Sequence, residues 1–326
     1  MRDNLDIAVL LGNGKSISNY TKPYFEDLFG RVDVISISGA FKLWNEYGIF
    51  PKYHYFGREM LDIWDSDELD DFFEAAWKAG TTVFVKDFEY VKYHTYSNVV
   101  KLKMLPLPVI SPDLNKWYHA FEYDLMLMED VLIEEVGGAE AANLVIKNLP
   151  DNVDERLNWK GLLKTVRGSL IFGNEDYIPE NLDRFISVLA WPKSFHEFYY
   201  EIGNSGVVAA RILQLLGYKT TLLLGCDSKY VVKPDGTVDT VATHGIKNVF
   251  NGKSYHLSRD VDCEDCQTEE ALNTLMYNSW DILKDAIEYN QLDYNILNCT
   301  ENSALEFFSK TNIEQELTKK VVDKPR

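Results

Sequence analysis

The sequence predicts an α/β protein with a Rossmann-like, doubly wound and mostly parallel sheet. Short apolar runs recur along the chain, and each ends in a turn that leads into a stretch with helical spacing. This alternation is typical of βαβ units, whose strands pair in parallel. Hydrophobic residues make up 46% and charged residues 26% of the 326 residues, which is the composition of an ordinary globular protein.

The first strand is expected at residues 6–11, a continuous apolar run that ends in the turn Gly12-Asn13-Gly14-Lys15-Ser16. A helix is expected to follow this turn, to about Phe29. The other expected strands are residues 32–37, 53–56, 81–85, 220–224 and 294–297. The other expected helices are residues 40–47, 65–78, 207–216, 268–289 and 303–308.

The helix at residues 65–78 has the clearest terminal signals. Asp65 can cap its first turn, and Glu68 stands three residues later, as in a capping box. Asp65-Ser66-Asp67 also has the Asp-x-Asp form that many metal-dependent glycosyltransferases use. Because carboxylates in a first turn interact favourably with the helix dipole, we favour capping over metal binding here.

We expect a single domain over residues 1–310, with two departures from the α/β pattern. Prolines open a region rich in leucine, methionine and aromatic residues, which we interpret as a helical insertion at about residues 106–200. Residues of about 228–267 are polar and irregular, and a loop of this length is usually functional, so a lid is expected there. The final residues, 311–326, are expected to form a flexible tail.

The formal net charge of −18 argues against a nucleic-acid partner, whose phosphates would be repelled. No apolar run reaches the length of about 18 residues that a membrane span needs, and the N-terminus does not resemble a signal peptide, so we expect a cytoplasmic protein. Homo-oligomerisation stays open. The basic residues of the tail suit either a solvated terminus or a weak contact with an anionic membrane surface. They are Lys319, Lys320, Lys324 and Arg326.

The chain has four cysteines. Cys226 and Cys299 lie in apolar runs and are expected to be buried thiols. Cys263 and Cys266 form a Cys-x-x-Cys pair, but a zinc site normally needs a second pair of ligands, and none stands close by. We therefore expect no metal, and we leave open whether this pair is inert or redox-active.

The glycine turn after the first strand is a candidate ligand site. Glycines let the main chain approach a ligand closely, and the start of a helix offers N–H groups to a phosphate. Asn13 and Ser16 add side chains that can form hydrogen bonds. The turn matches neither the P-loop pattern nor Gly-x-Gly-x-x-Gly, so a plain strand-to-helix turn is the alternative.

Other polar segments follow predicted strands at their carboxyl ends, where open α/β sheets bind ligands. Asn204-Ser205-Gly206 opens the buried helix, either as an N-cap or as a second set of donors that face a nucleotide. The remaining segments are Ser38, Gly57-Arg58-Glu59 and Asp227-Ser228-Lys229-Tyr230.

Three parts of the chain form an ordered set of motifs. The first is residues 11–16, the second joins residues 204–207 to Leu216-Gly217-Tyr218-Lys219 and Leu224-Gly225-Cys226-Asp227, and the third is residues 296–303. This set resembles the bacterial sialyltransferases of glycosyltransferase family forty-two and the related MptE-like DUF115 proteins. Those enzymes have a Gly-Asn-Gly-x-Ser turn, a Ser-Gly helix start, Leu-Gly-Tyr-Lys, a strand that ends in Gly-x-Asp, and a closing strand with an Asn-Ser turn.

The resemblance implies a Rossmann-like glycosyltransferase fold, with a nucleotide at the Asn13 turn and a lid after Asp227. Tyr230 stands where those enzymes keep a phosphate-binding tyrosine. Two asparagines of the family are absent, with Ser38 and Gly57-Arg58 in their places, which leaves cytidine specificity open. The expected nucleotide-binding residues are Gly12, Asn13, Gly14, Ser16, Ser38, Gly57, Arg58, Asn204, Ser205, Gly206, Asp227 and Tyr230.

The family's catalytic histidine lies in the lid region, for which this sequence offers two equal candidates, His256 and His244. A histidine suits the base that takes the proton of an acceptor hydroxyl near neutral pH. The leaving phosphate needs donors or positive charge, which Tyr230, Lys229 and Arg58 can supply. We therefore expect metal-independent transfer, with no cofactor other than a nucleotide-sugar co-substrate.

We interpret the chain as a glycosyltransferase that transfers a sugar, for example sialic acid from a CMP-sugar, to a hydroxyl of a glycan acceptor. One alternative is a DUF115-type pterin diphosphokinase that uses ATP and magnesium, with Glu59, Asp227 and Asp260 as candidate metal ligands. Another alternative is a nucleotide-binding protein without catalytic activity. Magnesium dependence separates the first two interpretations.

Overall fold

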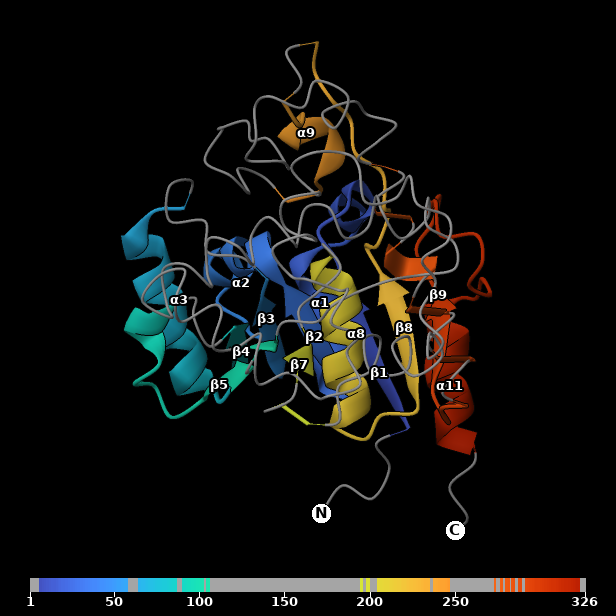
Figure 1. Cartoon of the computed structure of the whole chain (residues 1–326), viewed down its shortest axis with the longest axis horizontal. Coiled ribbons are helices and arrows are strands. Elements are labelled where there is room, and N and C mark those ends of the chain that lie inside the picture. Colours follow the sequence, from blue (N-terminus) through green and yellow to red (C-terminus); the bar gives the residue numbers. More distant parts are fainter. Residues whose placement is uncertain are drawn as a thin grey trace, which may run out of the picture.

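The computed structural model describes most of the α/β part of the chain. The described residues are 6–57, 64–86, 90–102, 104–105, 194–195, 198–199, 204–234, 237–246, separate positions between 273 and 288, and 291–322. They form a seven-stranded parallel sheet in the order β5-β4-β3-β2-β1-β8-β9, with helices on both faces (Figure 1). This arrangement confirms the predicted fold class.

The strands lie within a residue or two of the predicted runs, and β5 is the one strand of this sheet that the sequence analysis missed. Their bounds are β1 Ile7–Leu11, β2 Asp33–Ile37, β3 Tyr53–Phe56, β4 Thr82–Lys86, β5 Val99–Leu102, β8 Thr220–Leu224 and β9 Asn295–Asn298. The α-helices are α1 Lys22–Arg31, α2 Phe41–Tyr47, α3 Ser66–Ala79, α8 Ser205–Leu215, α9 Thr240–Thr243 and α11 Ile313–Val322. Short 3-10 helices are η1 Lys15–Asn19, η2 Ser38–Ala40 and η3 Val91–Tyr93.

The central strand β1 is buried on both faces of the sheet. Ala8 and Leu10 face a core that includes α8 and Trp280, whereas Val9 and Leu11 face a core that includes α1, α2, α3 and α11. All four side chains are fully buried, which explains why the strand reads as a continuous apolar run. The chain leaves β1 through α1 on one face and returns to its other neighbour, β8, through α8 on the opposite face. The topological switch point therefore lies between β1 and β8.

The residues predicted to begin and end the helices form the expected caps. The Asp65 carboxylate accepts a hydrogen bond from the Asp67 N–H at 3.1 Å, and Glu68 accepts one from the Asp65 N–H at 3.4 Å, so the capping box is complete. Gly48 and Gly80 end α2 and α3 in the left-handed conformation, with φ of 64° and 75°. The Asp-x-Asp sequence at this point is thus part of a helix cap.

The predicted insertion at about residues 106–200 lies almost wholly outside the described residues. At its two ends, the short strands β6 (Met104–Leu105) and β7 (Phe198–Tyr199) pair in parallel. The ring of Phe195 lies 5.4 Å from that of Phe84 in β4. The chain therefore leaves and re-enters the described part of the structure at neighbouring strands.

The helix expected at residues 303–308 is absent, and turns take its place. The Ser303 hydroxyl donates to the Cys226 carbonyl at 2.8 Å and accepts from the Leu305 N–H at 3.2 Å. The Asn298 amide donates to the Leu305 carbonyl at 3.0 Å. Ser303 and Asn298 thus fix this segment to the turn after β8 and to the end of β9, so tertiary contacts override the local helical spacing.

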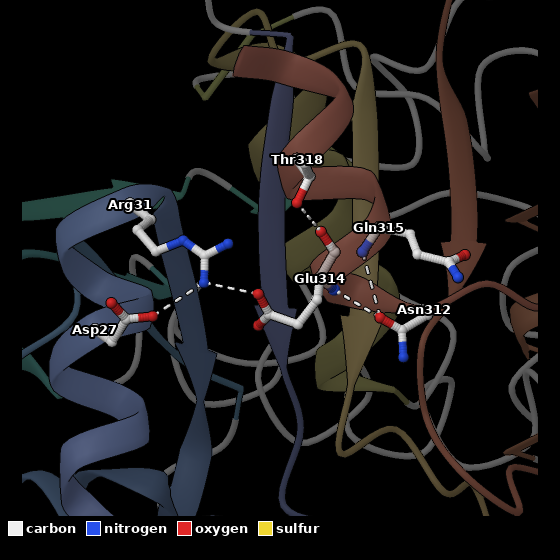
Figure 2. A network of polar contacts seen from close by, with 6 residues as sticks. All are labelled: Asp27, Arg31, Asn312, Glu314, Gln315 and Thr318. Atoms are coloured by element: carbon white, nitrogen blue, oxygen red, sulfur yellow. Dashed lines mark hydrogen bonds and ion pairs between the residues drawn. The ribbon is translucent and has the colours of Figure 1, made fainter. Parts of the chain in front are cut away.

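The predicted flexible tail is also wrong for its larger part, because α11 packs on the sheet. Ile313 and Leu317 are buried in the same core as α1. Asn312 caps the helix by accepting from the Glu314 and Gln315 N–H groups, and Glu314 accepts from Arg31 of α1 at 2.8 Å (Figure 2). Burial of this apolar stripe, with a side-chain cap, is sufficient to order the segment.

We expect Leu317→Ala to lower the free energy of unfolding by about 2–4 kcal/mol, because it removes a buried side chain and leaves a cavity. Gln315→Ala, two residues earlier on the exposed face of α11, should change it by less than about 0.5 kcal/mol. Urea denaturation of the two variants measures both values. Equal, small effects would mean that α11 is not part of the cooperative fold.

Candidate functional site

Polar segments from distant parts of the sequence meet at the carboxyl edge of the sheet. The turn of residues 12–16 follows β1, Ser38 follows β2, Gly57 follows β3 and Asp227 follows β8, while residues 204–206 open α8. In Figure 1 this edge is the one nearest α9. Because it contains the switch point between β1 and β8, it is the expected ligand site of an open α/β sheet.

Ser38, Gly57 and Ser205 form the first of two clusters at this edge. The Ser38 hydroxyl donates to the Ser205 hydroxyl at 3.2 Å. A Cβ atom on Gly57 would lie 2.0 Å from the Ser205 hydroxyl oxygen, so any side chain at this position would displace that hydroxyl. Ser38 has a φ of 44°, a left-handed conformation that is unusual for serine. The cluster thus brings three of the predicted binding residues next to one another.

Asn204 acts as the N-cap of α8, one of its two predicted roles. Its side-chain oxygen accepts from the Gly206 N–H at 2.8 Å, and its amide donates to Ser279 at 3.3 Å. Gly206 faces Trp280, whose ring would be 2.6 Å from an added Cβ atom. Asn204 and Gly206 therefore have structural reasons for their identity, whatever ligand the edge binds.

The glycine turn and the turn after β8 form the second cluster. The Asp227 carboxylate accepts from the Ser16 hydroxyl at 2.6 Å and from the Ser16 N–H at 3.2 Å. The Gly14 N–H donates to the Gly225 carbonyl at 2.8 Å. A Cβ atom on Gly14 would lie 2.0 Å from the Asp227 carboxylate, so this glycine makes room for the aspartate.

The helix that was expected to begin at this turn starts later. Residues 15–19 form the 3-10 helix η1, and α1 begins only at Lys22. The negative group at the start of η1 is the carboxylate of Asp227 itself. Two like unit charges about 4 Å apart repel by roughly 4 kcal/mol at an effective dielectric constant of about 20, so a phosphate beside an ionised Asp227 would be strongly disfavoured.

Burial raises the pKa of Asp227, and the hydrogen bonds from Ser16 and the charge of Lys229 oppose this rise. Two lysines that follow the site strands donate to main-chain carbonyls. Lys15 Nζ lies 2.9 Å from the Val241 oxygen, and Lys229 Nζ lies 2.9 Å from the Asn302 oxygen. Their ammonium groups therefore tie loops together around the second cluster.

His244 packs directly on the glycine turn. Its Nδ1 lies 3.3 Å from the Asn13 carbonyl oxygen, to which the Gly245 N–H also donates at 3.1 Å. Burial lowers the pKa of His244 to about 4, and the Asn13 carbonyl only partly opposes this. The histidine is therefore neutral near pH 7, with the Nδ1 proton directed to Asn13 and the lone pair on Nε2.

Tyr230 lies beside His244, with the two rings 6.3 Å apart and edge to face. Asn273, which the sequence analysis missed, holds the tyrosine's main chain: its side chain accepts from the Tyr230 N–H at 2.6 Å and donates to the Tyr230 carbonyl at 3.1 Å. No pattern in the sequence marks this pairing, because an asparagine inside a predicted helix has no expected partner.

Lys86 is a second residue that the sequence analysis missed. It is the last residue of β4 and only 4% of it is exposed. Phe84, two residues earlier, belongs to the core on the α8 side, so strand alternation places Lys86 on that side at the carboxyl edge. A lysine in phase with the apolar residues of a strand is the signal that could have identified it.

Two motifs of the resemblance have structural roles in this chain. Tyr218 lies at the opposite, amino edge of the sheet, where its hydroxyl donates to Asp33 at 2.5 Å. Thr300 and Ser303 brace the turn after β8: Thr300 accepts from the Cys226 N–H at 3.0 Å, and Ser303 donates to the Cys226 carbonyl. The third segment therefore positions Asp227 and does not itself line the first cluster.

His54 and the two described cysteines belong to the core. His54 is fully buried, its Nδ1 lies 2.7 Å from the Ser36 hydroxyl, and burial lowers its pKa to about 3. Cys226 is buried and Cys299 is half-buried, and burial raises the pKa of both thiols. These thiols are therefore protonated and unreactive near neutral pH.

Several predicted positions lie outside the described residues. They are Arg58, Glu59, His256, Asp260, Cys263, Cys266 and most of the predicted lid beyond residue 246. Among the residues that the structure describes, no group of three histidine, cysteine or acidic side chains is arranged to hold a metal ion. The described helices include none that is long and apolar enough to cross a membrane.

Comparison with protein-family models, with curated proteins and with solved structures finds no match to this chain.

We expect His244 to make the fold less stable as the pH falls from 6.5 towards 4. Histidine in the unfolded chain titrates near pH 6.5, so in this window the unfolded state binds a proton that the folded state does not. His244→Asn keeps a donor for the Asn13 carbonyl and removes the titration. It should reduce the slope of unfolding free energy against pH by up to about 1.4 kcal/mol per pH unit. An NMR titration that places the His244 pKa near 6.5 would contradict this.

Proposed function

We propose that this chain is a glycosyltransferase that binds a nucleotide sugar at the carboxyl edge over β1, β2, β3 and β8. The observation that carries the proposal is the convergence of separate polar segments at one switch point. These segments are the ones that the resemblance to sialyltransferases and MptE-like proteins marks for the nucleotide. A CMP-sugar is the first donor to test, and a glycan hydroxyl is the proposed acceptor.

The proposed chemistry needs a base and a stabilised leaving phosphate. His244 supports the first role because it is neutral near pH 7 and directs its Nδ1 proton to a carbonyl, which keeps Nε2 as the proton acceptor. Tyr230, held beside it by Asn273, is a candidate donor to the phosphate. His256 stays an equal candidate for the base. Metal-independent transfer is part of the proposal.

A second candidate function is nucleotide binding without catalysis. The pKa of His244, at about 4, favours this candidate, because a general base works best when its pKa lies near the working pH. The diphosphokinase interpretation relies on carboxylates that bind magnesium, and the one described candidate, Asp227, is engaged by Ser16. The ligand screen described next therefore also tests the diphosphokinase interpretation.

A thermal-shift screen tests the proposed function. We expect CMP or a CMP-sugar to raise the melting temperature without magnesium, because a ligand that binds only the folded state stabilises it by mass action. UDP, GDP, ADP and ATP, each with and without magnesium, are the comparison ligands. A shift with ATP that needs magnesium would favour the diphosphokinase, and no shift with any nucleotide would reject the proposal.

We expect His244→Ala or His256→Ala to abolish sugar transfer while the affinity for the nucleotide stays within about threefold, because a base acts in the transition state more than in ground-state binding. His94→Ala is the matched control, since His94 is the C-cap residue of η3 and belongs to neither cluster. Transfer is measured with radiolabelled donor. If both variants retain nucleotide binding and no assay detects transfer by the wild type, the non-catalytic candidate is favoured.

A further inference from the structure

We infer that the second cluster recognises vicinal hydroxyl groups of the ligand and does not hold its phosphate, with Asp227 as the principal hydrogen-bond acceptor. The inference rests on the proposed function, because it states which part of a nucleotide sugar the glycine turn contacts. The hydroxyls are those of the ribose or of the transferred sugar, which share this chemistry.

Three main-chain donors of the glycine turn and the hydroxyl of Ser16 are already used within the protein. The Gly12 N–H donates to the Leu224 carbonyl at 2.8 Å, and the Gly14 N–H donates to the Gly225 carbonyl at 2.8 Å. The N–H and hydroxyl of Ser16 both donate to Asp227. An anion site at a turn needs main-chain N–H groups that point outward to the ligand, and this turn directs three of them inward.

The Asp227 carboxylate also opposes a phosphate at this turn. Asp227 contributes a carboxylate, and His244 is neutral near pH 7. Lys15 and Lys229, the lysines of these two turns, donate to carbonyls of the surrounding loops. A phosphate placed beside Asp227 would therefore be repelled by its carboxylate, while the ammonium groups of the two lysines are directed to main-chain oxygens of the loops.

The acceptors of this cluster are the Asp227 carboxylate and the side-chain oxygen of Asn13, whose amide nitrogen is also a donor. A carboxylate has about four lone-pair positions, and Ser16 accounts for only part of them. The side-chain oxygen of Asn13 is buried and has no hydrogen-bond partner, which is a rare state for a polar atom.

Hydroxyl groups are the ligand donors that complement such acceptors. A carboxylate that follows a strand of a Rossmann sheet commonly binds the hydroxyls of a ribose, which is the same pairing of charge acceptor and diol. A protein that binds a nucleotide sugar must also hold the phosphate, and this inference places it towards Ser38 and Ser205, on the α8 side of the same edge, where Lys86 ends the adjacent strand β4. The role of phosphate donor proposed above for Tyr230 does not apply if the inference holds.

The decisive variant is Asp227→Asn, which keeps the shape and an acceptor for Ser16 but removes the charge. Asp293→Asn is the matched control, because Asp293 is exposed at the amino edge and the substitution changes the net charge equally. Calorimetry of the full chain measures the affinity for cytidine, 2′,3′-dideoxycytidine, CMP and CMP-sialic acid, with the uridine, adenosine and guanosine series in parallel.

We expect Asp227→Asn to weaken binding of cytidine and CMP by about tenfold or more, and we expect the control variant to leave it within about twofold. Asp227→Asn should not change the affinity for 2′,3′-dideoxycytidine. This ligand lacks the hydroxyls that Asp227 would bind, so the substitution has no further interaction to remove. If Asp227→Asn weakens only CMP-sialic acid, the recognised hydroxyls are those of the transferred sugar, and the inference holds with that source.

Equal or tighter binding of nucleotides by Asp227→Asn would overturn the inference, because a phosphate site gains from the loss of a nearby negative charge. Should this variant fail to fold, the affinities of the wild-type chain for the same ligands test the inference. Equal affinities of the wild type for cytidine and 2′,3′-dideoxycytidine, and for CMP with and without its sugar, would also overturn it. Absence of binding by every nucleoside and nucleotide is a different result, which rejects the proposed function itself and the inference with it.

Discussion

The contact between Asp227 and the turn after β1 is the interaction on which the carboxyl edge of this sheet depends. It joins the two strands that flank the topological switch point, through hydrogen bonds from both the hydroxyl and the N–H of Ser16. Gly14 leaves the space that the carboxylate fills, and Gly12 leaves the space for the Gly225 carbonyl. Thr300 and Ser303, after β9, hold the Cys226 main chain from the other side. A ligand over β1 and β8 therefore meets a surface whose shape this carboxylate has fixed.

That constraint separates the edge into two chemically different parts. Around β1 and β8 the N–H groups of Gly12, Gly14 and Ser16 are used internally and Asp227 supplies an acceptor. Around β2 and β3 the hydroxyls of Ser38 and Ser205 lie beside the first turn of α8. Ser38 keeps a left-handed backbone conformation there, and such strain persists where function or the surrounding packing requires it. A nucleotide sugar carries both a polyanionic part and polyol parts, so its chemistry matches an edge that is divided in this way.

The sequence was sufficient to predict most strands because a strand buried on both faces is a continuous apolar run, as β1 and β8 are. Helix ends were equally clear where a local signal decides them, as Asp65 and Gly80 do for α3. The wrong predictions have a common physical cause, because contacts with residues distant in the sequence decide the structure of these segments. Ser303 forms a turn because it binds Cys226, and α11 is ordered because Ile313 and Leu317 are buried under a sheet that the local sequence does not reveal. The contacts of the candidate site were the hardest to predict, since Asp227 and Ser16 are separated by 211 positions.

His244 shows how the same burial both favours and limits the proposed chemistry. Desolvation keeps its imidazole neutral, which a base requires, but a pKa of about 4 makes it a weak proton acceptor. A negative charge close to an imidazole favours its protonated form, so the phosphate of a bound nucleotide sugar would raise this pKa towards the working pH. Under the proposed function, His244 would then be an effective base only in the complex with the donor, and its strength would depend on which part of the ligand lies near Asn13. If hydroxyls contact the second cluster and the phosphate lies towards α8, the greater distance makes the rise in the His244 pKa smaller. His256 is then the more important of the two candidate bases to test.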